Sequence, residues 1–236
     1  MSSQATASLA ADPRVVRGMR AQLGVRRERL ASGERSLGWK LGFGGAPAME
    51  RLSIAAPLVG FLLASGLEEP GASVPIGDWA NPALESEVAV HLARDLPPAA
   101  DEGTLREAIA GIAPAFELVD VDPPPEDVEE ILTGNIFQRG CVLGPPSGRR
   151  SLEGVTGRVS VNGAEPTVVE DPEELTGELL RLVRHTADVL TAFGETPRAG
   201  EVLIMGAILP FLRVSPGDRV DYELDPVGAV SIRFED

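Results

Sequence analysis

The sequence predicts one α+β domain with a strand-rich core, preceded by a helical arm. Residues 84–92 alternate in character as expected for a β-strand that shows a different set of side chains on each face. Residues 173–193 repeat apolar side chains at helical spacing and end at Gly194, which is typical of a helix C-terminus. Residues 202–234 contain four short strand-like segments separated by turns. Together these features indicate a mixed fold without an internal repeat.

Length and charge limit the possible classes of function. The 236 residues are 43% hydrophobic and 24% charged, which fits one large domain with an arm. We assign the arm to residues 1–36 and the main domain to residues 37–236. The net charge of −15 argues against nucleic acid or an anionic membrane as a partner. No apolar run approaches the roughly 20 residues that span a bilayer, and the first residues do not resemble a signal peptide. We therefore expect a cytoplasmic protein.

The predicted elements begin with a helix over residues 13–30. Seven arginines lie between residues 14 and 35, and we expect them on a solvated or subunit-facing side. A short buried strand over residues 39–43 follows. The remaining expected elements are a strand at 84–92, a helix at 101–109, a strand at 115–121, a stiff turn at 123–125, one or two helical turns at 127–132, strands at 141–143 and 157–161, a helix at 173–193, and strands at 202–205, 211–214, 219–224 and 229–234.

Lysine, histidine and cysteine are each rare in this chain. Lys40 is the only lysine, against twenty arginines. Because a buried lysine can lose its proton while arginine almost never does, Lys40 is a candidate for a reactive amine. The alternative is a surface lysine without a role. His91 is expected to be packed or at the surface, His185 to be exposed on the long helix, and Cys141 to be a buried small hydrophobe that cannot form an internal disulfide.

Two glutamates form the first part of a candidate metal site. Glu85 and Glu87 are two residues apart in a predicted strand, so their side chains point to the same face with Cα atoms about 7 Å apart. Two carboxylates directed together repel each other unless a cation lies between them. A solvent-facing strand edge is the alternative. Ala89, which is next on the same face, is not a typical exposed strand residue and argues against that alternative.

Glu117 is the third member of the candidate site. It lies inside a predicted strand of buried character, where an ionised carboxylate is costly unless it is paired or bound to a cation. Three carboxylates without cysteine, and with hardly any histidine, describe a site for a hard cation such as Mg²⁺ or Mn²⁺. Zinc would favour nitrogen or sulfur ligands.

Three motifs in a fixed order resemble the fumarylacetoacetate hydrolase superfamily. They are Gly38-Trp39-Lys40-Leu41-Gly42, Glu85-Ser86-Glu87 and Pro114-Ala115-Phe116-Glu117-Leu118-Val119-Asp120. Within the superfamily, the match is to the branch of 2-keto-4-pentenoate hydratases and 4-oxalocrotonate decarboxylases, and it runs from about residue 37 to residue 234. The resemblance implies a mixed β-roll with flanking helices. It also implies metal ligands at Glu85, Glu87 and Glu117, with the active-site lysine at Lys40.

The resemblance further implies a metal-dependent lyase that acts on a small 2-oxo acid or a 2-hydroxydienoate. The resemblance implies that the 2-oxo acid chelates the cation, Mg²⁺ or Mn²⁺, and that the cation stabilises an enolate. Lys40 moves a proton or stabilises the developing negative charge. The reaction would be either addition of water or loss of carbon dioxide. The family resemblance and the apolar C-terminal strands also lead us to expect a homo-oligomer.

The sequence departs from the family pattern at the substrate end of the pocket. Leu58 stands where the hydratases usually carry an acidic residue, which is more similar to the decarboxylases. Residues 133–137 keep Asn135 but lack the acid and the serine of the family pattern, and residues 206–209 have no hydroxyl group. We expect Leu58 and Asn135 to contact the substrate in a more apolar pocket.

Three alternatives remain open from the sequence. Two are enzymes of the same superfamily, an acylpyruvate hydrolase and an oxaloacetate decarboxylase. The third is a binding homologue that kept the cavity and lost the chemistry. The hydrolases of the superfamily use a histidine near the start of the domain, and no histidine precedes His91, which makes a hydrolase the less favoured assignment.

Overall fold

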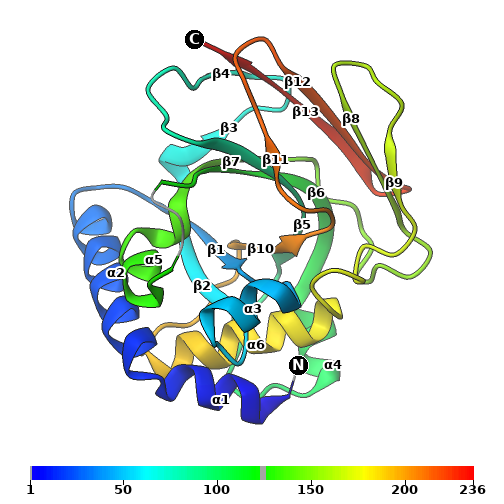
Figure 1. Ribbon diagram of the computed structural model, residues 1–236. Helices are drawn as coiled ribbons and strands as arrows, with labels where there is room; N and C mark the ends of the chain where they lie inside the picture. Colours follow the sequence, from blue (N-terminus) through cyan, green and yellow to red (C-terminus); the bar gives the residue numbers. More distant parts are fainter. Residues whose placement is uncertain (1, 123–125) are drawn as a thin grey trace.

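The computed structural model describes residues 2–122 and 126–236, so the turn expected at residues 123–125 lies outside the described part. An eight-stranded mixed sheet curves into an open roll (Figure 1). Seven strands follow the order β2-β1-β10-β5-β6-β7-β3, and β11 pairs with β5. The strands are β1 (Ser36–Gly42), β2 (Leu58–Leu63), β3 (Leu67–Glu68), β5 (Pro82–Leu92), β6 (Ile109–Asp120), β7 (Gln138–Leu143), β10 (Val202–Ala207) and β11 (Leu212–Arg213).

A second sheet of five strands covers one side of the roll and includes the final two strands of the described chain (Figure 1). Its order is β4-β13-β12-β8-β9. Its strands are β4 (Ser73–Pro75), β8 (Thr156–Val161), β9 (Thr167–Val169), β12 (Arg219–Asp225) and β13 (Gly228–Glu235). In β12 and β13 buried and more exposed residues alternate, because one face of this sheet packs on the core.

The described residues form six α-helices around the main sheet, with α2 and α5 on one side and α1 and α6 along its lower edge (Figure 1). They are α1 (Ser3–Ala11), α2 (Pro13–Ala31), α3 (Ala46–Leu52), α4 (Glu102–Ala108), α5 (Val128–Thr133) and α6 (Leu179–Ala192). Four of them begin at a capping side chain that accepts a backbone N–H, namely Ser2, Asp12, Asp101 and Asp127. Pro13 directly follows the Asp12 cap, where its missing N–H costs nothing.

The expected α+β roll with flanking helices is confirmed. The buried apolar residues lie between the main sheet, the second sheet and the helices in one large cluster, and a smaller cluster contains Ala89, Ala113, Ala115 and Cys141. The N-terminal segment contacts the main domain, since α1 packs on α6 and α2 packs on α5. No helix in the described part of the chain has the length and apolar character needed to cross a bilayer.

The prediction of a helix over residues 173–193 is wrong at its start. The helix α6 begins at Leu179, and residues 173–178 form a loop in which Leu175 is exposed. Gly177 has φ +107°, which is incompatible with a right-handed helix. This glycine, inside an otherwise periodic segment, is the sequence feature that could have indicated the later start of the helix. The first helix, α1, was not anticipated because its sequence of small and polar residues has little amphipathic pattern.

Two basic side chains are buried within the chain, although His185 was expected to be exposed and Arg26 to lie on a solvated or subunit-facing side. His185 is 2% exposed, because its ring lies between α1 and the loop before β2, where it contacts the Thr6 hydroxyl and the Pro57 carbonyl oxygen. Arg26 is 7% exposed and lies over the Trp39 ring at 4.3 Å. In each case a specific partner compensates for removing the side chain from water.

Candidate metal centre and active site

The pairing of β5 with β6 brings the three glutamates together. Glu85 lies directly opposite Glu117 in the antiparallel ladder, and Glu87 lies two residues further along β5 on the same face. One carboxylate oxygen from each residue lies within 4.8 Å of the others. Glu87 and Glu117 are almost completely buried, whereas Glu85 is partly exposed. The structure therefore brings together the three residues that the sequence singled out.

The electrostatics of this cluster show that its charge is poorly compensated. Burial and the neighbouring charges of Glu117 and Glu85 raise the pKa of Glu87 well above its ordinary value. Burial also raises the pKa of Glu117 to about 7, although Lys40 acts in the opposite direction. The pKa of Glu85 is raised by burial in the same way. A single positively charged neighbour does not balance three closely spaced carboxylates, two of which are buried.

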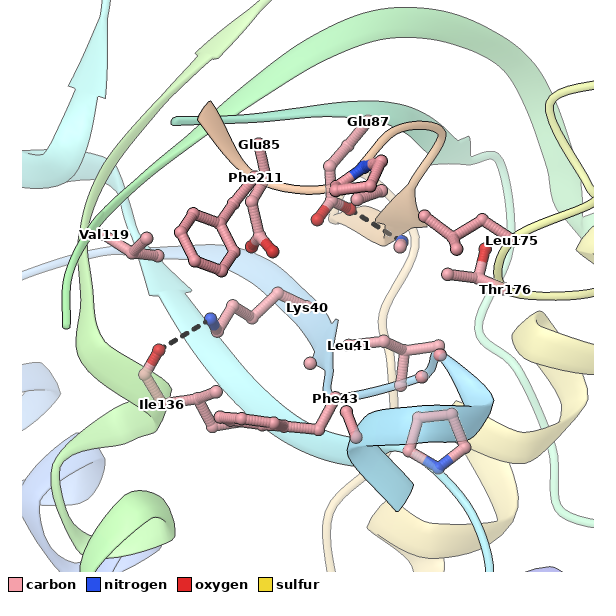
Figure 2. Close-up of a pocket in the computed structure, with 18 of the residues that line it drawn as sticks. Lys40, Leu41, Phe43, Glu85, Glu87, Val119, Ile136, Leu175, Thr176 and Phe211 are labelled. Carbon is pink, nitrogen blue, oxygen red and sulfur yellow. Dashed lines mark hydrogen bonds between the residues drawn. The ribbon is translucent and has the colours of Figure 1, made fainter. Parts of the chain in front are cut away.

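Lys40 occupies β1, which lies between β2 and β10. Its side chain is 1% exposed, forms an ion pair with the Glu117 carboxylate, and donates a hydrogen bond to the carbonyl oxygen of Ile136 at 3.0 Å (Figure 2). The Glu87 carboxylate has a different partner, the backbone N–H of Gly206 at 2.6 Å (Figure 2). The only lysine of the chain is thus fixed next to the three glutamates.

A left-handed turn at residues 135–137 shapes the surroundings of Lys40. Asn135, Ile136 and Phe137 have φ values of 52°, 55° and 60°, which is costly for a β-branched residue such as Ile136. The Asn135 amide holds this turn against β2, because it accepts from the Phe61 N–H and donates to the Phe61 carbonyl oxygen, both at 2.9 Å. The turn presents the Ile136 carbonyl to Lys40.

A cavity of about 440 Å³ opens above the lysine and the glutamates. Lys40, Glu85 and Glu87 form its polar end, and most of its remaining wall is apolar (Figure 2). Leu58 and Asn135, which we expected to contact a substrate, do not line it. Leu58 is fully buried in the main core, and the amide of Asn135 is occupied by Phe61. The structure gives both residues a supporting position.

Several lining residues were not identified from the sequence. Thr176 lies in the loop at residues 173–178, which was predicted from the sequence to be part of a helix. Phe211 and Arg213 come from the segment around β11, and Arg51 comes from α3. No periodic pattern marks these positions, because each lies in or beside a loop or a very short element.

The remaining candidate residues lie elsewhere. Neither His91 nor His185 lines the cavity. Cys141 is buried, as predicted, and burial raises the pKa of its thiol to about 12. Asp120 is used within the fold, where its carboxylate accepts from the Asn81 N–H at 2.7 Å and from Arg139 at 2.9 Å.

The glutamate cluster fits a divalent cation. Glu117 Oε2 is buried and has no hydrogen-bond partner in the part of the chain that the structure describes. An unpartnered buried oxygen beside carboxylates with raised pKa values is the arrangement expected of residues that would hold a cation. The donor set consists of oxygen atoms alone, which suits Mg²⁺ or Mn²⁺ rather than zinc.

Comparison with known proteins places the chain in a family. A 2-hydroxyhexa-2,4-dienoate hydratase from Comamonas testosteroni is 31% identical over 218 residues, covering 88% of this chain and 81% of that enzyme. The chain belongs to the family of 2-keto-4-pentenoate hydratases and 4-oxalocrotonate decarboxylases, within the fumarylacetoacetate hydrolase superfamily. A 2-keto-4-pentenoate hydratase from Paraburkholderia xenovorans is 26% identical over 214 residues, covering 88% of this chain and 79% of that enzyme. No protein-family model matches the chain.

A solved structure of this hydratase and decarboxylase family has the same fold. The 4-oxalocrotonate decarboxylase from Pseudomonas putida G7, complexed with magnesium and adipate, superposes with a TM-score of 0.85 at 24% identity. The match covers 92% of this chain and 84% of that structure. This confirms the fold that the motif resemblance implied. The named relatives are hydratases and decarboxylases, which are enzymes of lyase type.

Proposed function

We propose that this protein is an Mg²⁺- or Mn²⁺-dependent lyase that acts on a small 2-oxo acid or 2-hydroxydienoate. The observation that carries the proposal is the cluster of Glu85, Glu87 and Glu117, whose carboxylate oxygens lie within 4.8 Å of one another beside Lys40. The hydratase relatives and the magnesium complex of the decarboxylase with the same fold support it. Addition of water and loss of carbon dioxide both remain within this proposal.

The chain's own residues have separate roles in the proposed reaction. Glu85, Glu87 and Glu117 would hold the cation. When bound, a divalent cation would polarise the 2-oxo group and stabilise negative charge that develops beside it. Lys40 Nζ would hold or move a proton at the reacting carbon, and its bonds to Glu117 and Ile136 keep it in one orientation. The apolar wall would limit the access of bulk water.

Hydrolysis of an acylpyruvate is a weaker candidate on structural grounds. The hydrolases of the superfamily use a histidine to activate water, and neither histidine of this chain lines the cavity. Product analysis separates the remaining reactions. Release of carbon dioxide from 4-oxalocrotonate or oxaloacetate identifies a decarboxylase, and formation of a hydroxylated 2-oxo acid from 2-hydroxypenta-2,4-dienoate identifies a hydratase.

Calorimetric titration with MgCl₂ or MnCl₂ tests the metal site. The variants Glu85→Gln and Glu117→Gln should each lose more than about tenfold in affinity, because each removes a charged ligand. Glu223→Gln is a matched control, since Glu223 is an exposed strand glutamate in β12 far along the chain from the cluster. Unchanged affinity in both cluster variants would remove the metal site and the proposed lyase with it.

Turnover of Lys40 variants tests the role of the amine. Lys40→Arg keeps a positive charge but cannot readily give up a proton, and Lys40→Met keeps the length of the side chain without the charge. We expect both to lose about 10²–10⁴-fold in kcat, while circular dichroism shows a folded protein. A binding homologue without chemistry would bind metal and turn over none of the substrates named above.

A further inference from the structure

The cavity is larger than a short 2-oxo acid requires. Its volume of about 440 Å³ falls within the range of pockets that enclose drug-sized ligands. A short 2-oxo acid has about eight non-hydrogen atoms, which fill a minor part of such a pocket. With its acid group beside Lys40, Glu85 and Glu87, this ligand would leave most of the remaining cavity to water.

The part of the cavity that such an acid would not fill has an apolar lining. Figure 2 shows these side chains around the polar end, with Phe211 and Val119 on one side of Lys40 and Leu175 on the other. Leu41, Phe43 and Ile136 lie on the Lys40 side of the cavity and continue the apolar surface. Water held against such a lining makes few hydrogen bonds, so an apolar ligand group would replace it favourably.

Part of the exposed apolar surface lies at this cavity. Five large hydrophobic side chains are exposed in the described part of the chain, and two of them, Phe211 at 47% and Leu175 at 37%, line the cavity. The Phe211 ring is held in position by Arg213. The Arg213 guanidinium lies over the ring at 5.4 Å and donates to the Asn81 carbonyl oxygen at 3.3 Å. An exposed but oriented aromatic ring beside a polar site is a typical ligand-binding feature.

We propose that the substrate carries an uncharged alkyl or aryl substituent at the end remote from its 2-oxo acid group, and that Phe211 and Leu175 select it. This inference rests on the proposed function, because the Lys40, Glu85 and Glu87 end is taken to hold the 2-oxo acid. Arg51 and Arg213 also line the cavity and define the competing possibility, a second carboxylate at the remote end.

Calorimetry with unreactive saturated acids tests the proposal. 2-Oxobutyrate, 2-oxohexanoate and 2-oxooctanoate are titrated into the full-length protein in the presence of Mg²⁺. Burying each added methylene should raise the affinity about three- to fourfold. Phe211→Ala should reduce this gain per methylene. Val168→Ala is the matched control, since Val168 is also 47% exposed but does not line the cavity, and it should keep the wild-type gain.

Each outcome decides between the possibilities. Equal affinity for all three acids, or a chain-length gain that Phe211→Ala leaves intact, would overturn the apolar subsite. Tighter binding of 2-oxoadipate than of 2-oxohexanoate, lost in Arg51→Ala, would assign the remote end to a second carboxylate instead. In these cases Mg²⁺-dependent binding of 2-oxobutyrate would leave the proposed function standing. If none of the acids binds with Mg²⁺, both the proposed function and the subsite fail.

Discussion

Glu85 and Glu117 face each other across the β5–β6 ladder, in a direct cross-strand position. Like charges at such positions destabilise a sheet, and burial increases the effect. Lys40 offsets one of these charges through its ion pair with Glu117, and Glu87 adds a third carboxylate to the same face. In the absence of a cation, the residues proposed to bind the metal therefore weaken the fold that holds them.

Replacing one buried glutamate should have opposite effects with and without metal. In Glu87→Gln, the Gln side-chain oxygen can still accept from the Gly206 N–H, while the charge repulsion is removed. We expect a higher Tm than wild type in EDTA. With Mg²⁺ at 100 times the wild-type Kd, wild type gains about 2.7 kcal/mol and the variant gains little. Thermal melts in EDTA and in Mg²⁺ measure whether the order of the two Tm values reverses. A lower Tm for the variant in EDTA would contradict the prediction.

Raised carboxylate pKa values should make the metal-free protein less stable at higher pH. Burial raises the pKa of Glu117 from 4.5 to about 7, so between these values the folded state binds more protons than the unfolded state. The free energy of unfolding therefore falls as pH rises from about 4.5 through 7. Urea unfolding in EDTA at a series of pH values measures the slope. Glu117→Gln should reduce the slope of unfolding free energy against pH. The Mg²⁺ affinity of the wild type should rise over the same pH range, because Glu117 must be deprotonated to bind the metal.

His185 should contribute an opposite dependence at lower pH. Burial lowers its pKa from 6.5 to about 4, so the unfolded state binds more protons in this window. The free energy of unfolding that this residue contributes falls as pH drops from 6.5 towards 4, by up to about 3 kcal/mol. His185→Gln retains an amide that can reach the Pro57 carbonyl but does not titrate. Its unfolding free energy should be lower at pH 7 and should depend less on pH between 4 and 6.5 than that of wild type.

Gly60 should be required for the position of Lys40. A Cβ atom at Gly60 would lie 2.9 Å from Asn135 Oδ1 and 3.1 Å from Lys40 Cε. Gly60→Ala should therefore displace the lysine and lower kcat by about 10²-fold, with a loss of about 1–3 kcal/mol in stability. Gly24→Ala is the control, because a Cβ there meets nothing within 4 Å in α2 and should slightly stabilise the helix. Wild-type kcat in Gly60→Ala would show that the lysine tolerates displacement.

Asn135 should act on turnover through the left-handed turn rather than by contact with substrate. Removing its amide leaves two groups of the buried Phe61 backbone without partners, at a cost of about 1–3 kcal/mol each. Asn135→Ala also forces alanine into a left-handed conformation, so it should be less stable than Asn135→Gly by about 1 kcal/mol. Both should lower kcat more than they raise KM. A change in KM alone would instead indicate a substrate contact.

The sequence was most informative where a local repeat fixes a side-chain direction. The two-residue period of β5 placed Glu85 and Glu87 on one face, and the buried character of β6 identified Glu117. The register that sets Glu85 opposite Glu117 depends on pairing between segments far apart in the chain, and no local pattern specifies it. The position of Lys40 could not be predicted for the same reason, because its strand pairs with β10, which is far away in the sequence.

The substrate end of the site was the least predictable part. Phe211 and Thr176 reach the cavity from irregular segments, whose paths are set by tertiary packing. Asn135 was predicted from the sequence to contact the substrate, and its amide group alone does not show what it binds. Only the geometry shows that both hydrogen-bonding atoms are engaged by Phe61.

The parallel pairing of β1 with β10 has a consequence for how the protein is made. Gly38 lies beside Val202, so the strand that carries the lysine leaves the ribosome well before this neighbour has been synthesised. Until then one edge of β1 has no partner, and nascent chains with an open edge are prone to associate with one another. The surroundings of Lys40 are therefore complete only once residue 202 has been synthesised, and chains released before that point would lack them.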